Sequence, residues 1–135
     1  MIFALLNFVE RYFEEISQLV LPRIFSTPWN VQIAMLDGLA SVFQGIRSSK
    51  GAEALLAVDE TKVQLEMMFT CLSEAKYPAV RAASLKCVKD LVYAIRETSL
   101  WIPEIRAQVE AGIAPSLNDT VGETADYANQ VKILL

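Results

Sequence analysis

Apolar residues recur along this chain at steps of three and four positions, the spacing of one face of an α-helix. The pattern is most regular after Pro78, and prolines or short polar runs interrupt it at several points. No segment alternates apolar and polar residues between hairpin turns. We therefore predict an all-α chain of six helices paired into three hairpins. The expected helices cover residues 2–25, 28–48, about 59 up to the run SEAKYP, 78–97, 103–114 and 120–134.

Each predicted helix has an apolar face that we expect to be buried. In the helix over 28–48 this face carries Val31, Ala34, Met35, Leu39, Val42, Phe43 and Ile46. In the helix after Pro78 it carries Val80, Ala83, Ser84, Cys87, Val88, Leu91, Val92 and Ile95. The outward residues of that helix are expected to be Arg81, Lys86, Lys89, Asp90 and Glu97. Small residues such as Ala34 and Ala83 let two helices approach closely.

Capping residues mark the starts of several helices. Thr27 is the predicted N-cap of the second helix, followed by a proline at a position where its missing N–H costs nothing. Asp59 or Thr61 is expected to cap the third helix. Thr120 followed by Glu123 matches a capping box at the start of the last helix.

The chain also repeats itself. The segment VRAASLKCVKDLV from Val80 aligns with VQIAMLDGLASVF from Val31, and a looser third copy begins near Val121. Gln32 stands in the first copy where the second has Arg81. Repeats of this kind are typical of helical solenoids, in which each hairpin covers the apolar face of the next.

The stretch YPAVRAASLKCVKDL resembles the start of the inner helix of a HEAT repeat. The matching positions are Pro78, Val80, Arg81, Ala83 and Leu85. The resemblance implies a right-handed α-solenoid of about three antiparallel helix hairpins. The implied repeats cover 1–47, 59–97 and 102–135, with a linker over 48–58. It also implies that Arg81 pairs with an aspartate of the neighbouring repeat.

The same resemblance implies a function. Large HEAT proteins are scaffolds and adaptors that bind other proteins, so we expect a non-catalytic protein-binding role. The chain begins MIFALL and finishes VKILL, with apolar side chains on more than one side of each terminal helix. We expect neighbouring repeats of a longer protein to cover these ends. The alternative is a six-helix bundle that self-associates through its apolar terminal helices and has a structural role in complex assembly.

Composition narrows the partners. Twelve basic and sixteen acidic residues leave a formal charge of −4, which disfavours general binding to nucleic acid. No apolar run approaches the roughly 20 residues that a membrane-spanning helix needs, and the first residues lack the features of a signal peptide. We therefore expect protein partners rather than nucleic acid or membrane.

Histidine is absent from the chain, which removes Ser-His and Cys-His catalysis and histidine metal sites. The two cysteines, Cys71 and Cys87, lack the spacing of a metal site and lie in apolar helical contexts. We predict no enzyme activity, no cofactor and no metal site. Two packed thiols favour a reducing compartment, the cytosol or the nucleus.

Five residues are candidates for partner contact. Arg81, Lys86 and Lys89 give the helix after Pro78 a basic side, which is either a solvated face with ion pairs to Asp90 and Glu97 or a docking ridge for an acidic partner segment. For Arg81 the HEAT resemblance favours the structural role. Trp29 and Trp101 lie at helix starts, where tryptophan either contacts a partner or packs over the end of a hairpin.

Overall fold

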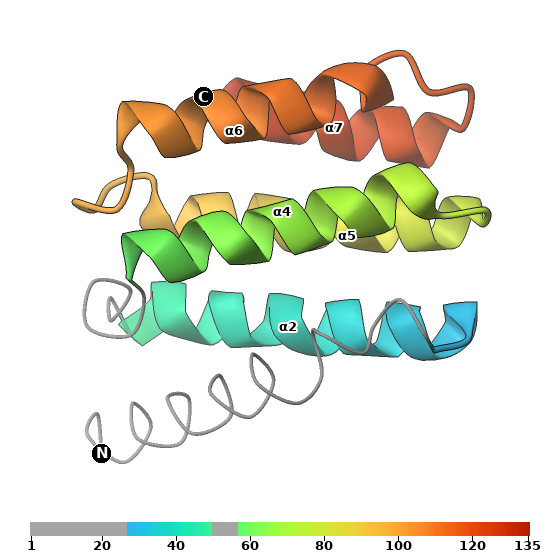
Figure 1. Ribbon diagram of the computed structural model, residues 1–135, viewed down its shortest axis with the longest axis horizontal. Helices are drawn as coiled ribbons and strands as arrows, with labels where there is room; N and C mark the ends of the chain where they lie inside the picture. The colour runs from blue at the N-terminus through green and yellow to red at the C-terminus, as the bar shows by residue number, and fades with distance from the viewer. Residues whose placement is uncertain (1–26, 50–56) are drawn as a thin grey trace.

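The computed structural model describes residues 27–49 and 57–135, which fold as helices joined by short turns (Figure 1). The elements are α2 (Trp29–Ser49), α4 (Val58–Glu74), α5 (Pro78–Ile95), α6 (Pro103–Ile113), the 3₁₀ turn η3 (Ala114–Ser116) and α7 (Gly122–Leu134). No strand occurs among the described residues, so the all-α prediction is confirmed for this part of the chain. The helix expected over 2–25 and most of the expected linker lie outside it.

The boundaries of the helices follow the local sequence. Proline occupies the first turn of α5 and of α6, where its fixed φ suits the helix and its missing N–H leaves no bond unmade. The described helices end within two or three residues of the predicted positions. Proline acts on the backbone of its own helical turn, so these helix starts can be predicted from the sequence.

The predicted caps of α4 and α7 are wrong. The N-cap of α7 is Val121, without a side-chain cap, and the backbone N–H of Val121 donates to Oδ1 of Asp119 at 2.8 Å. An aspartate that accepts a bond from the residue two positions on forms an Asx turn, and this turn replaces the expected capping box. In α4 the N-cap is Ala57, and the Thr61 hydroxyl donates to the Ala57 carbonyl at 2.9 Å.

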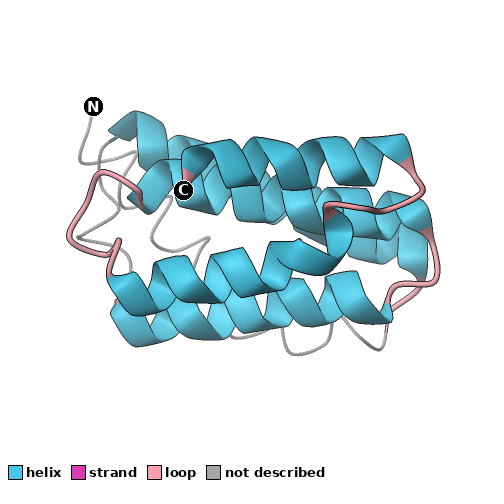
Figure 2. Cartoon of the chain, turned by 90° about the horizontal axis from the view of Figure 1, so that it is seen from above, coloured by secondary structure: helices cyan, strands magenta, loops and turns pink. Residues whose placement is uncertain are grey.

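The helices lie in two layers (Figures 1 and 2). One layer contains α2, α5 and α7, with α5 in the middle and in contact with both neighbours. The second layer contains α4 and α6, which pack on each other and on α5 and α7 respectively. In Figure 1, α2, α5 and α7 run in one direction, whereas α4 and α6 run in the other. The pairs α4–α5 and α6–α7 are therefore antiparallel hairpins.

The core lies between the two layers and is centred on α5. Leu85, Val88 and Leu91 of this helix are fully buried, and the largest buried side chain of α2 is Phe43. All the residues predicted to face inward on α5 are buried. Because α5 has neighbours on three sides, Ala82, Asp90 and Ala94 are buried as well. The prediction that Asp90 faces outward is therefore wrong.

The first turns of α2 also differ from the prediction. Val31 is 38% exposed and Ala34 is exposed, whereas Leu36 and Ala40 are buried. Ala34 therefore does not mediate close packing, although Ala83 is buried as expected. A spacing of three or four residues identifies a helix face, but it does not locate the helices that cover this face.

The second layer closes tightly where α4 meets α6. A Cβ added to Gly112 would lie 2.5 Å from the ring of Phe69, closer than any relaxed contact. The Gln108 side-chain amide also donates to the backbone carbonyl of Lys62 at 2.9 Å.

None of the described helices has the length and apolar content needed to cross a membrane.

Candidate functional site

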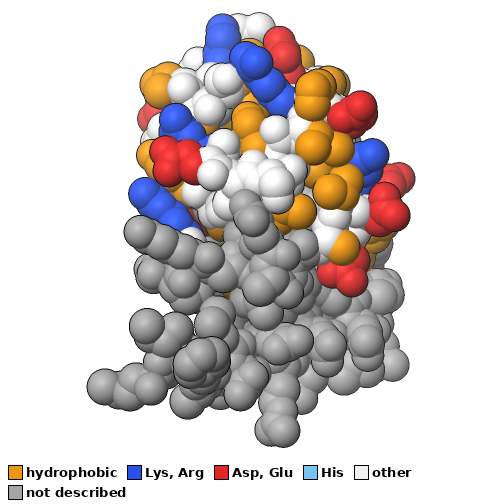
Figure 3. Space-filling model, turned by 90° about the vertical axis from the view of Figure 1, so that its left-hand side faces the viewer, with side chains coloured by type: hydrophobic (Ala, Val, Ile, Leu, Met, Phe, Trp, Pro, Cys, Tyr) orange, Lys and Arg blue, Asp and Glu red, His pale blue; other side chains and the backbone are white. Residues whose placement is uncertain are grey.

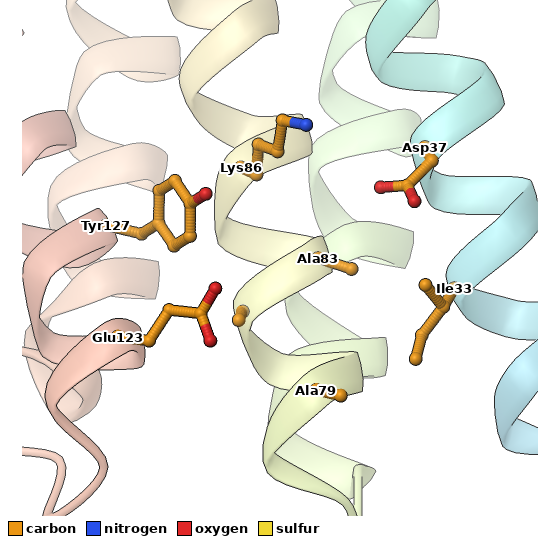
Figure 4. Close-up of a pocket in the computed structure, with 8 residues that line it drawn as sticks. Ile33, Asp37, Ala79, Ala83, Lys86, Glu123 and Tyr127 are labelled. Atoms are coloured by element: carbon orange, nitrogen blue, oxygen red, sulfur yellow. The ribbon is translucent and has the colours of Figure 1, made fainter.

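The helices α2, α5 and α7 form a continuous surface on the side away from α4 and α6, which we call the three-helix face. A groove of about 210 Å³ runs along α5 on this face (Figure 4). Alanines of α5 form its floor, while residues of α2 and α7 form its two walls. The lining residues are Ile33, Asp37, Ala79, Ala82, Ala83, Lys86, Glu123 and Tyr127.

The groove carries more negative than positive charge. Asp37 of α2 and Glu123 of α7 point toward α5 from opposite walls, and Lys86 projects over the groove between them (Figure 4). Among the described residues, none of these three groups makes an ion pair within 4 Å. The alanine floor offers no side-chain hydrogen bonds. The groove can therefore accept a cationic group between two carboxylates that make no ion pair with any residue the structure describes.

An exposed aromatic pair lies one helical turn beyond this groove. The rings of Trp29 and Tyr77 have centroids 5.0 Å apart, and the two residues are 45% and 49% exposed. Trp29 is four positions before Ile33 on α2, and Tyr77 is two positions before Ala79 at the start of α5. The aromatic pair therefore continues the groove toward the start of both helices.

From Tyr127 in the groove wall toward the opposite end of the three-helix face, the polar groups are paired with one another. Nζ of Lys89 donates to Oε1 of Gln130 at 3.0 Å and lies 5.5 Å from the centre of the Tyr127 ring. The guanidinium carbon of Arg47 lies 4.2 Å from the centre of the Tyr93 ring. These contacts connect α5 to α7 and to α2, so they hold the layer together.

The buried Asp90 belongs to this paired end. Its Oδ2 accepts a hydrogen bond from Nε2 of Gln44 on α2 at 3.1 Å. A buried carboxylate needs such a donor because desolvation without a partner is costly. Asp90 therefore joins α5 to α2 and does not pair with the basic side chains of its own helix.

Arg81 lies at the boundary between two hairpins. Its Nε is 3.2 Å from Oδ2 of Asp119, in the turn between α6 and α7. The backbone N–H of Val121 and the Arg81 guanidinium together hold the pKa of the Asp119 carboxyl below its ordinary value of 3.8. This is the kind of ion pair that the HEAT resemblance implies for Arg81.

The expected basic ridge is therefore not a continuous free surface. Arg81 pairs with Asp119, Lys89 pairs with Gln130, and Lys86 alone of the three lines the groove. Acidic and basic side chains are also interspersed at the end of the described helices remote from Trp29 (Figure 3).

The two tryptophans have different environments. Trp29 is exposed, whereas Trp101 packs against the core and lines a shallow hollow beside α6. Trp101 is therefore partly buried, whereas Trp29 presents exposed aromatic surface beside Tyr77. The sequence pointed to Trp29 and Lys86 but missed Asp37, Glu123 and Tyr77. These three residues come together only when α2, α5 and α7 are placed side by side.

The cysteines lie in the core and are free thiols. Burial, with a smaller effect from Glu74, raises the pKa of Cys71 from 9.0 to about 11. Burial also raises the pKa of Cys87 well above 9.0, with further contributions from Asp90 and Cys71. Both thiols are therefore protonated and unreactive at neutral pH. The described residues contain no group of three or more carboxylates and thiols arranged to hold a metal.

No family model, no curated protein and no solved structure matches this chain.

Proposed function

We propose that this chain is a segment of a right-handed HEAT-like α-solenoid that acts as a non-catalytic scaffold or adaptor. It binds another protein along the three-helix face. The observation that carries this proposal is the groove between α2, α5 and α7, whose two carboxylates have no ion pair within the described residues.

The arrangement of the helices supports the repeat interpretation. Two antiparallel hairpins, α4–α5 and α6–α7, follow one another, and their second helices lie side by side with α2. Arg81 and Asp119 join consecutive hairpins. Stacked hairpins joined in this way produce an extended surface that suits recognition of another chain.

The chemistry of the described residues supports a binding role. The chain has no histidine, and its two thiols are buried with raised pKa values. The groove offers two carboxylates and a lysine but no activated nucleophile. Free buried thiols also suit a reducing compartment, the cytosol or the nucleus.

Site-specific photo-crosslinking tests the proposal. A photoreactive amino acid at the exposed Ala79 in the groove should capture a partner protein, whereas the same group at the exposed Ala107 of α6 should not. The captured protein, purified, should lose binding to the Ala79→Arg variant in calorimetry. Equal capture at both positions, or unchanged binding to the variant, would contradict the proposal.

A structural role in self-association is the second candidate, and one observation favours it. Ile133, near the end of α7, is 82% exposed, more than any other large apolar side chain among the described residues. Sedimentation velocity separates the two functions. A discrete dimer that becomes a monomer in the Ile133→Ser variant, without capture of another protein at Ala79, would favour self-association.

A further inference from the structure

We propose that the groove and the Trp29–Tyr77 pair together dock an extended segment of another protein that carries a lysine or arginine about four residues from a bulky apolar residue. This inference rests on the scaffold function proposed above and names the chemistry of its partner.

The cationic residue follows from the charges of the groove. Asp37 and Glu123 face the same space from opposite walls, and Lys86 compensates only one of them. A lysine or arginine from a partner would lay its aliphatic stem on the alanine floor and direct its charged end to the carboxylates. An acidic residue in this place would add a third carboxylate to the two already present, which is unfavourable.

The apolar residue follows from the exposed aromatic pair. Trp29 and Tyr77 are in contact and half-exposed, so their rings already hold each other in place. A partner side chain that covers them buries apolar surface at a small cost in side-chain entropy. Ala79 also lies at this end of the groove, and it is exposed too. The apolar anchor of the partner therefore belongs here.

The spacing of the two anchors follows from the geometry of α2. Trp29 and Asp37 are eight positions apart, which corresponds to about 12 Å along a helix that rises about 1.5 Å per residue. An extended chain advances about 3.3 Å per residue, so about four residues cover this distance. Neither anchor fixes the direction of the partner chain, so both orders of the two residues are expected to bind.

Nuclear magnetic resonance measures this docking directly, because the chain has two tryptophans in different places. The probes are Gly/Ser peptides with one lysine and one leucine, separated by two, four or six positions. On titration into the ¹⁵N-labelled full chain, the indole signal of Trp29 should shift and that of Trp101 should not. The separation of four should bind most tightly, and replacing the lysine by glutamate should weaken binding at least about tenfold.

Matched variants locate the cation site. The Asp37→Asn/Glu123→Gln double variant should weaken the lysine peptide at least about tenfold. The Glu66→Gln/Glu110→Gln double variant removes the same charge from exposed positions of α4 and α6. It should bind as the unaltered chain does. Circular dichroism establishes that both variants are folded.

Any of four other outcomes would overturn the inference, and each has a different meaning. Tighter binding of the glutamate peptide, dependent on Lys86, would leave the scaffold function standing but would reverse the partner's charge. Equal weakening by both double variants would indicate a general charge effect. Absence of any shift at peptide concentrations above about 1 mM would exclude this segment as the partner. A Trp29 shift that depends on protein concentration alone would make a second copy the occupant. The crosslinking at Ala79 tests the scaffold function independently.

Discussion

The two ends of the three-helix face differ in how their polar groups are satisfied. At the end that carries Arg47 and Lys89, each cation lies over a tyrosine ring, and Lys89 also donates to Gln130. At the end that carries Asp37 and Glu123, the carboxylates flank an alanine floor and make no ion pair within the described residues. The same three helices therefore form one end that is internally paired and one that is open.

This difference predicts which side chains contribute to folding and which are available to a partner. Interactions at the paired end connect α5 to both neighbours, so their loss should affect folding. Groups at the open end contribute little to folding, and they remain available to a partner. Variants at the two ends should thus affect different measurements, and four predictions test this separation.

The largest effect should come from the helix that both ends share. Leu91 of α5 is fully buried, so Leu91→Ala should lower the free energy of unfolding by about 2–5 kcal/mol. Urea denaturation measures the loss. Ile133→Ala, at an exposed position of α7, should change stability by less than about 0.5 kcal/mol. Similar effects of the two variants would contradict the placement of α5 at the centre of the core.

The next largest effect on stability should appear when one heavy atom is added to the tightly packed second layer, and not when it is added in the groove. Gly112→Ala should destabilise the protein by about 1–3 kcal/mol, because the new methyl group meets the Phe69 ring and offsets any gain in helix propensity. Ala79→Ser also adds one heavy atom, but at an exposed position in the groove. It should change stability by less than about 0.5 kcal/mol. Thermal unfolding of the two variants compares them, and a more stable Gly112→Ala variant would show that Phe69 moves aside freely.

A smaller effect separates the lysines at the two ends. Lys89→Ala removes a hydrogen bond and a cation–π contact, so it should cost about 0.5–1 kcal/mol of folding free energy. Lys86→Ala should leave stability within about 0.5 kcal/mol and should strengthen binding of the lysine peptide, because it removes a competing cation. Chemical denaturation and the peptide titration measure these two results. A reversed order of the two stability effects would remove the distinction between the ends.

The smallest effect concerns pH at the boundary between hairpins. Because the pKa of Asp119 is lowered on folding, its charged form contributes stability above about pH 4, the ordinary aspartate range. This contribution should disappear as the pH falls through the lowered pKa. The Asp119→Asn variant should therefore be less stable than the unaltered chain at pH 7, and the difference should shrink below about pH 4. A constant difference across acid denaturation curves would show that charge is unimportant there.

The sequence predicted helix positions better than burial. Boundaries at Pro78 and Pro103 were correct because proline acts through the local backbone. The predicted exposure of Asp90 and the predicted burial of Val31 were wrong, because helical spacing alone does not show how many helices surround a given turn. The predicted N-cap of α7 was wrong because the carboxylate of Asp119, which is paired with Arg81, also accepts a hydrogen bond from the backbone N–H of Val121.

The candidate site was only partly predictable. The sequence identified Lys86 and Trp29 by their residue types and by their places on the helices. It did not identify Asp37 and Glu123, because their shared position on either side of α5 depends on the packing of three helices. Arg81 was the exception, since the resemblance to a HEAT repeat implied an aspartate partner, and Arg81 does pair with Asp119 of the next hairpin.

The sequence by itself determined the class of structure: apolar residues at helical spacing, prolines at helix starts, and a repeated valine-led segment. These features act over one or two helical turns, through backbone hydrogen bonds and local sterics. The helices can therefore be predicted without knowledge of the tertiary structure. Only the tertiary structure decided that Lys89 is paired, while Asp37 and Glu123 make no ion pair with any of the described residues. Electrostatic and hydrogen-bonding partners are set by distances of a few ångströms between helices, and those distances exist only after α2, α5 and α7 have packed together.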